Sequence, residues 1–188
     1  MTGSTSKDAA GRQGRFRMSW LAGAALVVAV GVGVTGCATT ETPQGSSQGA
    51  APGTTADAFT AQTAAGAQVS VPGSKPSVLF FFSIECGACG PFTKALAEVQ
   101  RSDPEAANYV VVDVASYETA PEVEAFLTKN EASSLAYTVD TDAGLITAYQ
   151  INQLETTVVL DASGTEVFRG VAPSVAQIRD ALTEAGAR

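Results

Sequence analysis

The sequence predicts an α/β fold in which helices flank a central mixed β-sheet. From residue 67 onward, strand and helix signals alternate along the chain, the pattern that builds sheets covered by helices. Residues 77–83, SVLFFFS, form a continuous apolar run, which is typical of a central strand buried on both faces. We therefore expect one folded domain over residues 67–188.

The other elements follow from turn signals and apolar spacing. Further strands are expected at residues 68–71 (an edge strand), 109–114, 156–160 and 165–168. The last two form a hairpin, because Asp161-Ala-Ser-Gly164 between them has turn composition. Apolar residues at helical spacing predict four helices, marked by Phe92, Leu96 and Val99; by Val123, Phe126 and Leu127; by Leu145, Ile146 and Tyr149; and by Val175, Ile178 and Leu182, the last helix capped by Ser174.

The amino-terminal segment has the form of an export signal. Four basic residues and one acid in residues 1–17 precede an uncharged, mostly apolar run that extends from Met18 to Thr40. The sequence Val34-Thr-Gly-Cys37 resembles the lipobox of bacterial lipoprotein signal peptides, in which the cysteine becomes the first mature residue and takes the lipid. We expect residues 1–36 to be a signal peptide and lipidated Cys37 to anchor the protein on the extracytoplasmic face of the cell membrane. An uncleaved transmembrane anchor is the alternative.

Residues 37–66 are expected to be a flexible linker. They consist mostly of Gly, Ser, Thr, Pro, Gln and Ala, and Phe59 is their one large apolar side chain. Such a composition cannot bury a core, so this segment predicts a disordered tether between the lipid and the folded domain.

Composition excludes several classes of function. The chain has no histidine, which rules out His-ligated metal sites, Ser-His-Asp triads and Cys-His nucleophile pairs. The formal charge of −8 and the pI near 4.4 argue against a nucleic-acid partner, because phosphate binding relies on clustered Lys and Arg.

The clearest site signal is Cys86-Gly-Ala-Cys89, which lies where the buried strand gives way to a helix. At a helix amino terminus, unpaired N–H groups and the helix dipole favour a thiolate. We expect Cys86 to attack a disulfide and Cys89 to resolve the mixed disulfide. A merely structural disulfide is less suited to this position, since a link across two residues removes little unfolded-chain entropy. Binding of a soft metal ion by the two thiols is the other alternative.

These residues resemble those of a known protein family. The segment from Val78 to Cys89 looks like the thioredoxin active-site strand and turn, and residues 137–170 resemble the corresponding course of membrane-tethered TlpA/ResA-type thioredoxins. The resemblance implies a thioredoxin-like fold and thiol–disulfide exchange with no cofactor besides the redox-active cysteine pair. It further implies action on exported thiol or disulfide proteins, reduction in many relatives, and recharging by a membrane electron-donor protein.

Three departures from the family pattern stand out. Glu85 replaces the tryptophan that many relatives carry before the attacking cysteine, and a carboxylate there would raise the pKa of Cys86. Glu155, followed by Thr156, occupies the usual cis-proline position, so a cis bond is not expected there. These residues are expected to border the substrate groove or to modulate the cysteines, although Glu155 could instead point into solvent. Phe80 stands where thioredoxins often carry a buried carboxylate.

Two other classes of function remain as alternatives. The cysteines could capture Hg²⁺, Cu⁺ or Zn²⁺ with Glu85 or Glu155 nearby, or the domain could be an interaction module without turnover. Asp140 and Asp142 could suggest a cation site, but a solvated helix start explains them better, so no metal site is predicted from them.

Overall fold

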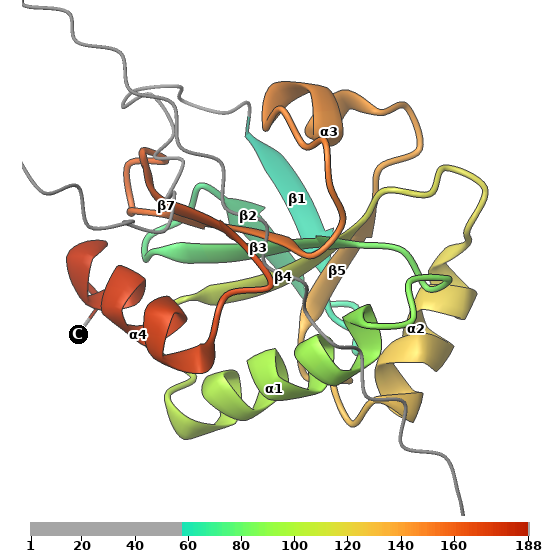
Figure 1. Ribbon diagram of the computed structural model, residues 1–188, viewed down its shortest axis with the longest axis horizontal. Helices are drawn as coiled ribbons and strands as arrows, with labels where there is room; N and C mark the ends of the chain where they lie inside the picture. The colour runs from blue at the N-terminus through green and yellow to red at the C-terminus, as the bar shows by residue number, and fades with distance from the viewer. Residues whose placement is uncertain (1–57, 188) are drawn as a thin grey trace, which may run out of the picture. The chain divides into compact units, whose positions relative to one another are not determined.

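A mixed sheet of seven strands forms the centre of residues 58–187, the part of the chain that the computed structural model describes (Figure 1). Its strand order is β2-β1-β5-β4-β3-β6-β7. The strands are β1 (Phe59–Gln62), β2 (Gln68–Val71), β3 (Ser77–Phe82), β4 (Asn108–Asp113), β5 (Ala136–Val139), β6 (Thr156–Leu160) and β7 (Glu166–Val171). The helices are α1 (Cys89–Ser102), α2 (Ala120–Lys129), α3 (Gly144–Ala148) and α4 (Val175–Glu184). The predicted fold class, an α/β fold with a mixed sheet flanked by helices, is confirmed.

The apolar run of residues 77–82 is the central strand, as predicted. β3 pairs in parallel with β4 and antiparallel with β6, and all six of its residues are buried. In the parallel register, Phe82 at the end of β3 lies beside Asp113 at the end of β4. The connections that follow β3 and β4 therefore leave the sheet at the same edge, on the right in Figure 1.

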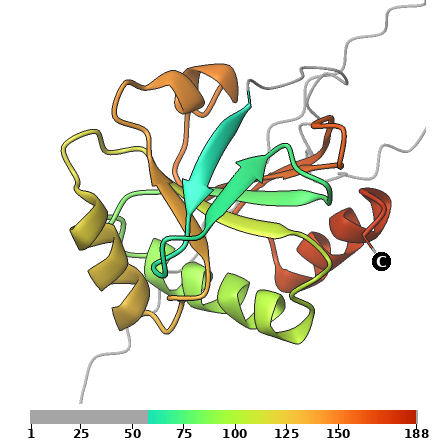
Figure 2. The ribbon, with the colours of Figure 1, turned by 180° about the vertical axis from the view of Figure 1, so that it is seen from behind.

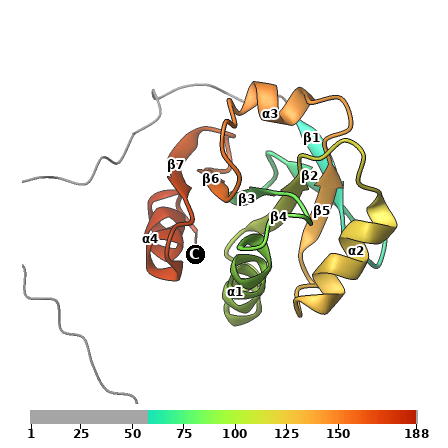
Figure 3. The same cartoon turned by 45° about the vertical axis from the view of Figure 1, so that its right-hand side comes forward.

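Side chains that alternate along β3 fill two apolar layers. Phe80 and Phe82 face the layer that α1, α2 and α4 cover, and their rings pack against Phe92 of α1 and Phe126 of α2, respectively. Leu79 and other apolar side chains of the opposite layer pack against α3 and the β1–β2 hairpin. Figure 3 shows α1, α2 and α4 on one side of the sheet and α3 on the other.

The folded region begins within the segment that was expected to be linker. β1 pairs antiparallel with β2, and the hairpin lies in the foreground of Figure 2. Ala61 is buried, and the Phe59 ring packs edge-on against Tyr149. The prediction of a flexible segment up to residue 66 is thus wrong for β1, which pairs with β2 on one side and with β5 on the other. β5 was also not among the predicted strands.

The helix starts differ in a way that affects the site. α2 and α4 begin with capping boxes, Thr119 with Glu122 and the predicted cap Ser174 with Gln177. α1 has neither a side-chain cap at Ala88 nor an acidic residue in its first turn. The amino terminus of α1, next to the cysteines, can therefore interact with a negative group such as a cysteine thiolate.

Candidate active site

Cys86 and Cys89 are joined by a disulfide at the junction of β3 and α1, with their Cα atoms 5.4 Å apart. Cys86 is half-buried and the two residues between the cysteines are exposed, whereas Cys89 is fully buried as the first residue of α1. This asymmetry fits the predicted roles: a disulfide on another molecule can reach Cys86, and Cys89 is held behind it.

Backbone hydrogen bonds define the turn that carries the cysteines. The Cys86 N–H donates to the Ser83 carbonyl at 3.1 Å, and the Cys89 N–H donates to the Cys86 carbonyl at 3.1 Å. Cys86 thus lies just before the uncapped amino terminus of α1, where the helix dipole favours a thiolate.

Glu85, the exposed residue before Cys86, has a partner that sequence reasoning missed. The Tyr117 hydroxyl donates to Glu85 Oε2 at 2.9 Å. Tyr117 is 69% exposed, and this hydrogen bond to a carboxylate raises its pKa above the usual value. An exposed tyrosine therefore binds the carboxylate that precedes Cys86, at the position where many relatives carry a tryptophan.

Two carboxyl groups lie buried behind the turn, and sequence reasoning missed these as well. Glu118 Oε1 accepts a hydrogen bond from the Ser83 hydroxyl at 2.8 Å, and its Oε2 accepts one from the Ile84 N–H at 3.0 Å. Asp113, at the end of β4, is completely buried. Burial and the neighbouring Glu118 carboxyl raise the pKa of Asp113 to about 8. Local sequence patterns do not predict that these two residues are buried. Asp113 ends an apolar strand, and Glu118 comes just before the N-cap of α2.

Glu155 and Thr156 lie next to the end of β3. Thr156 pairs with Phe81 in the β3–β6 register, and the Glu155 N–H donates to the Phe81 carbonyl at 3.0 Å. The Ala172 N–H donates to the Glu155 carbonyl at 2.9 Å, which links this loop to the end of β7. Glu155 is half-buried and adopts a left-handed backbone with φ of 64°, and the peptide bond before it is trans, as expected.

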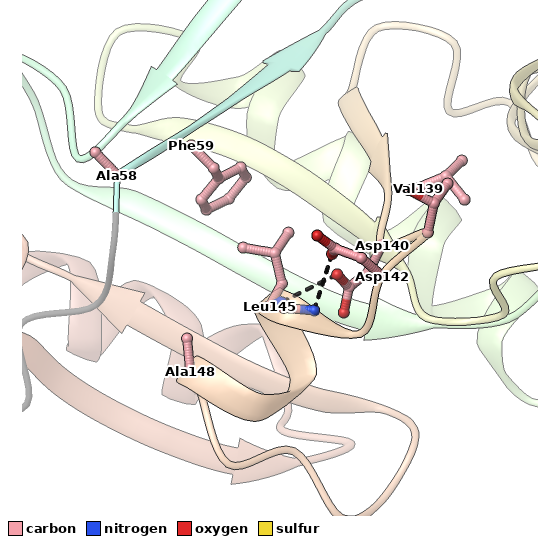
Figure 4. Close-up of a pocket in the computed structure, with 9 residues that line it drawn as sticks. Ala58, Phe59, Val139, Asp140, Asp142, Leu145 and Ala148 are labelled. Atoms are coloured by element: carbon pink, nitrogen blue, oxygen red, sulfur yellow. Dashed lines mark hydrogen bonds between the residues drawn. The ribbon is translucent and has the colours of Figure 1, made fainter.

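The aspartates after β5 serve the helix that follows them. Asp140 accepts a hydrogen bond from the Leu145 N–H and Asp142 accepts one from the Gly144 N–H, as Figure 4 shows, and Asp140 also accepts one from the Ile146 N–H. They line an open pocket of about 280 Å³ that Phe59 also borders. Both carboxylates thus act at a helix start, as predicted, although Asp140 is buried rather than solvated. Among residues 58–187, no cluster of three or more His, Cys, Asp or Glu side chains is placed to hold a metal ion.

The predictions on the amino-terminal segment lie outside the described residues. Cys37, the residue expected to carry the lipid, and the signal peptide before it belong to the part of the chain that the structure does not describe. Within residues 58–187, no helix has the length and apolar character needed to cross a bilayer.

Comparison with known proteins identifies the family. The family model described as thioredoxin-like matches residues 73–166, which is half of the chain. The chain belongs to the thioredoxin-like family. The matched region includes the cysteine turn, β4 with Asp113, Glu118 and Glu155.

Solved structures share this thioredoxin-like fold. A secreted disulfide oxidoreductase of Mycobacterium tuberculosis, homologous to Escherichia coli DsbE, is 22% identical and superposes with a TM-score of 0.55 over 67% of this chain and 95% of that one. StoA from Bacillus subtilis is 22% identical, with a TM-score of 0.55 over 68% of this chain and 96% of that one. The thioredoxin-like domain of the present chain has a cysteine pair of the kind that thiol–disulfide oxidoreductases use.

One relative in sequence is a Streptomyces lividans protein named mercury resistance operon ORF3. It is 38% identical over 122 residues, which make up 63% of this chain and 65% of that protein. The chain therefore spans less than two thirds of the length of this relative.

Proposed function

We propose that this protein is a membrane-anchored, extracytoplasmic thiol–disulfide oxidoreductase that reduces disulfides in exported proteins. The observation that carries the proposal is the Cys86–Cys89 disulfide, in which Cys86 is half-buried just before an uncapped helix terminus and Cys89 is fully buried. The names of the solved relatives, which include a secreted disulfide oxidoreductase, support the chemistry.

The reaction follows from this asymmetry. In the reduced protein, the Cys86 thiolate attacks one sulfur of a partner's disulfide, which forms a mixed disulfide and releases the partner's other sulfur as a thiolate. The Cys89 thiolate then attacks the Cys86 sulfur, which re-forms the Cys86–Cys89 disulfide and releases the second partner thiol. The partner gains two electrons and two protons, and this protein loses them. A dithiol protein on the membrane must then reduce Cys86–Cys89 again.

The surrounding charges favour the reductive direction. Glu85 and the buried pair Asp113 and Glu118 are acidic, and no Lys or Arg among residues 58–187 forms an ion pair with any of them. Negative neighbours disfavour the Cys86 thiolate. A reduced form that is poorly stabilised gives its electrons away more readily, because strong oxidants of this class are those whose reduced form is stabilised.

The sequence supports the proposed anchor. A lipid on Cys37 would hold the domain at the outer face of the membrane, where it meets exported disulfide proteins and a membrane electron donor. Metabolic labelling with a radioactive fatty acid tests this part: the wild-type chain should take up label, and Cys37→Ala should not.

Trapping tests the chemistry. Cys89→Ser leaves the attacking thiol in place and removes the resolving one, so it should accumulate mixed disulfides with exported proteins on non-reducing gels. Cys86→Ser should form none and should lose turnover of a model protein disulfide. Full turnover by Cys86→Ser would contradict the proposal.

A second candidate function is capture of Hg²⁺ by the two thiolates. The name of the Streptomyces lividans relative favours it, and thiolates are the protein ligands that soft metals prefer. Reduced protein that retains one Hg²⁺ per cysteine pair through gel filtration with excess competing thiol, while showing no disulfide turnover, would favour this function over the first.

A further inference from the structure

Glu85 and Tyr117 form an exposed pair next to the reactive cysteine. Glu85 directly precedes Cys86, and its Oε2 accepts the hydrogen bond from the Tyr117 hydroxyl at 2.9 Å. Consecutive Cα atoms lie about 3.8 Å apart, so a residue that neighbours a partner's cysteine comes within reach of Glu85 when that cysteine bonds to Cys86. Tyr117 is 69% exposed, so its ring is accessible as well.

The charge of Glu85 is not neutralised by a basic side chain of the described chain. The three ion pairs within residues 58–187 join Lys75 to Glu105, Lys94 to Glu131 and Arg169 to Glu166. Glu85 instead accepts from a neutral hydroxyl, which orients the carboxylate without cancelling its charge. The same hydrogen bond raises the pKa of Tyr117, so the phenol stays protonated and remains a donor at neutral pH.

The ring of Tyr117 adds a second group that attracts cations. The face of an aromatic ring attracts a Lys ammonium or an Arg guanidinium that lies over it. A basic side chain at this place can therefore make an ion pair with Glu85 and a cation–π contact with Tyr117. The chain as a whole has a formal charge of −8, which attracts basic partners over longer distances.

A second exposed apolar side chain lies at the same edge of the sheet. In the part of the chain that the structure describes, Tyr117 and Val171 are the two large apolar residues with strongly exposed side chains. Val171, at the end of β7, pairs with Thr156, and Thr156 pairs with Phe81 near the end of β3. Both exposed side chains thus belong to segments that meet where the cysteine turn leaves the sheet, which favours this edge as the contact surface for a partner.

We propose that Glu85 and Tyr117 determine partner specificity by binding a Lys or Arg side chain next to the partner's disulfide-bonded cysteine. The preferred partners are then proteins that carry a basic segment around a disulfide. This inference rests on the proposed function, because it names the class of partner for the same site. Neither residue exchanges electrons: the pair holds the partner while Cys86 attacks its sulfur.

The reaction of Cys86 with charged peptides tests the inference. In the full-length chain with Cys37→Ala and Cys89→Ser, which serves as the parent, Cys86 is the single thiol. Each peptide carries one cysteine in a disulfide with thionitrobenzoate, and the residues on both sides of that cysteine are Lys, Gln or Glu. The Cys86 thiolate attacks the peptide sulfur, forms a Cys86–peptide disulfide and releases thionitrobenzoate, whose absorbance gives the rate.

The measured quantity is the ratio of the rate with the Lys peptide to the rate with the Glu peptide. At low ionic strength the parent should give a ratio of about five to twenty, with the Gln peptide in between. Glu85→Gln should lower this ratio by at least about threefold, and Tyr117→Ala by about twofold. Tyr117→Phe keeps the ring and should change the ratio less. Added salt should also lower the ratio of the parent, because exposed charges are screened.

A matched control separates a local contact from overall charge. Asp180→Asn removes one negative charge at an exposed position of α4 and should leave the ratio nearly unchanged. Because each ratio is compared between proteins, the intrinsic reactivities of the peptides and of Cys86 cancel. An effect of Glu85 on the Cys86 thiolate alone therefore cannot produce the expected result. Equal ratios in the parent, Glu85→Gln and Asp180→Asn would overturn the inference, as would a parent that does not prefer the Lys peptide.

The result can be told apart from a failure of the proposed function. Thionitrobenzoate is a good leaving group, so an accessible Cys86 thiol reacts with the peptides even in a protein that turns over no protein disulfide. Normal turnover together with equal ratios would reject the preference for basic partners and leave the proposed function standing. A Cys86 thiol that reacts with none of the peptides would overturn both.

Discussion

The Tyr117 hydroxyl donates a hydrogen bond to Glu85 Oε2 at 2.9 Å, which holds a carboxylate next to the attacking cysteine. Both side chains are exposed, so the contact lies on the protein surface next to Cys86 in the sequence. The carboxylate opposes formation of the Cys86 thiolate, whereas the uncapped α1 terminus favours it. These two effects on the Cys86 thiolate oppose each other.

Replacing the charge should shift that balance. Glu85→Gln is expected to raise the rate of Cys86 alkylation at neutral pH by about two- to fivefold, because it removes a like charge from an exposed and screened position. Tyr117→Phe keeps the charge and should change the rate much less. In Glu85→Gln, the pKa of Tyr117, measured by ultraviolet absorbance, should also fall toward its usual value. An unchanged alkylation rate together with an unchanged Tyr117 titration would show that the two side chains do not interact in solution.

The buried Asp113 should make stability depend on pH. Its pKa is raised to about 8 in the folded protein but is about 4 in an unfolded chain. Between these values the folded protein holds more protons, so the stabilising contribution is fully present below about pH 4 and is lost as the pH rises through about 8. The free energy of unfolding, measured in urea, should therefore fall over this range more steeply for the wild type than for Asp113→Asn. Asp180→Asn should follow the wild type, and parallel curves for all three proteins would contradict the raised pKa.

The backbone at Glu155 predicts opposite effects for two substitutions. With φ of 64°, glycine fits without a Cβ clash, so Glu155→Gly should be neutral or stabilise the protein by up to about 1 kcal/mol. Proline requires φ near about −65° and would remove the N–H that donates to Phe81, so Glu155→Pro should cost at least about 3 kcal/mol. Urea unfolding measures both, with Glu155→Gln as the control for charge. A fully stable Glu155→Pro would mean that this loop can adopt the proline geometry of the relatives.

Gly90 is predicted to resist substitution although it lies in a helix. A Cβ atom there would lie 2.7 Å from Oδ1 of Asn130, whose amide donates to the Phe126 carbonyl at the end of α2. Gly90→Ala should thus destabilise the protein by about 1–3 kcal/mol, despite the better helix propensity of alanine. The double variant Gly90→Ala/Asn130→Ala should be less destabilised than the sum of the two single variants. Strict additivity in thermal or urea unfolding would show that the two residues do not collide.

Much of the domain could be predicted from local patterns. The run at residues 77–82 marked the central strand, and the spacing of Cys86 and Cys89 at its end marked the site. β1 was not predicted because its four residues lie in a segment of linker-like composition, and its place in the sheet depends on pairing with β2 and β5.

The buried carboxyl pair could not be predicted in this way. Ser83 and Glu118 are 35 residues apart and meet only because β3 and β4 are parallel and end at the same edge. Neither carboxyl residue has a periodicity that marks it as buried. The same holds for the contact between Tyr117 and Glu85, which joins two separate loops.

The reduction potential of Cys86–Cys89 tests the central claim most directly. A soluble form that begins at Ala38 is equilibrated in graded ratios of reduced to oxidised dithiothreitol, its free thiols are trapped, and the trapped groups are counted by mass. We predict a reversible two-electron transition at or below the potential of thioredoxin, about −270 mV, as expected of a reductant. A transition near about −120 mV, the value of a strong oxidant, or a pair that never reduces and re-oxidises reversibly, would contradict a reductive thiol–disulfide oxidoreductase.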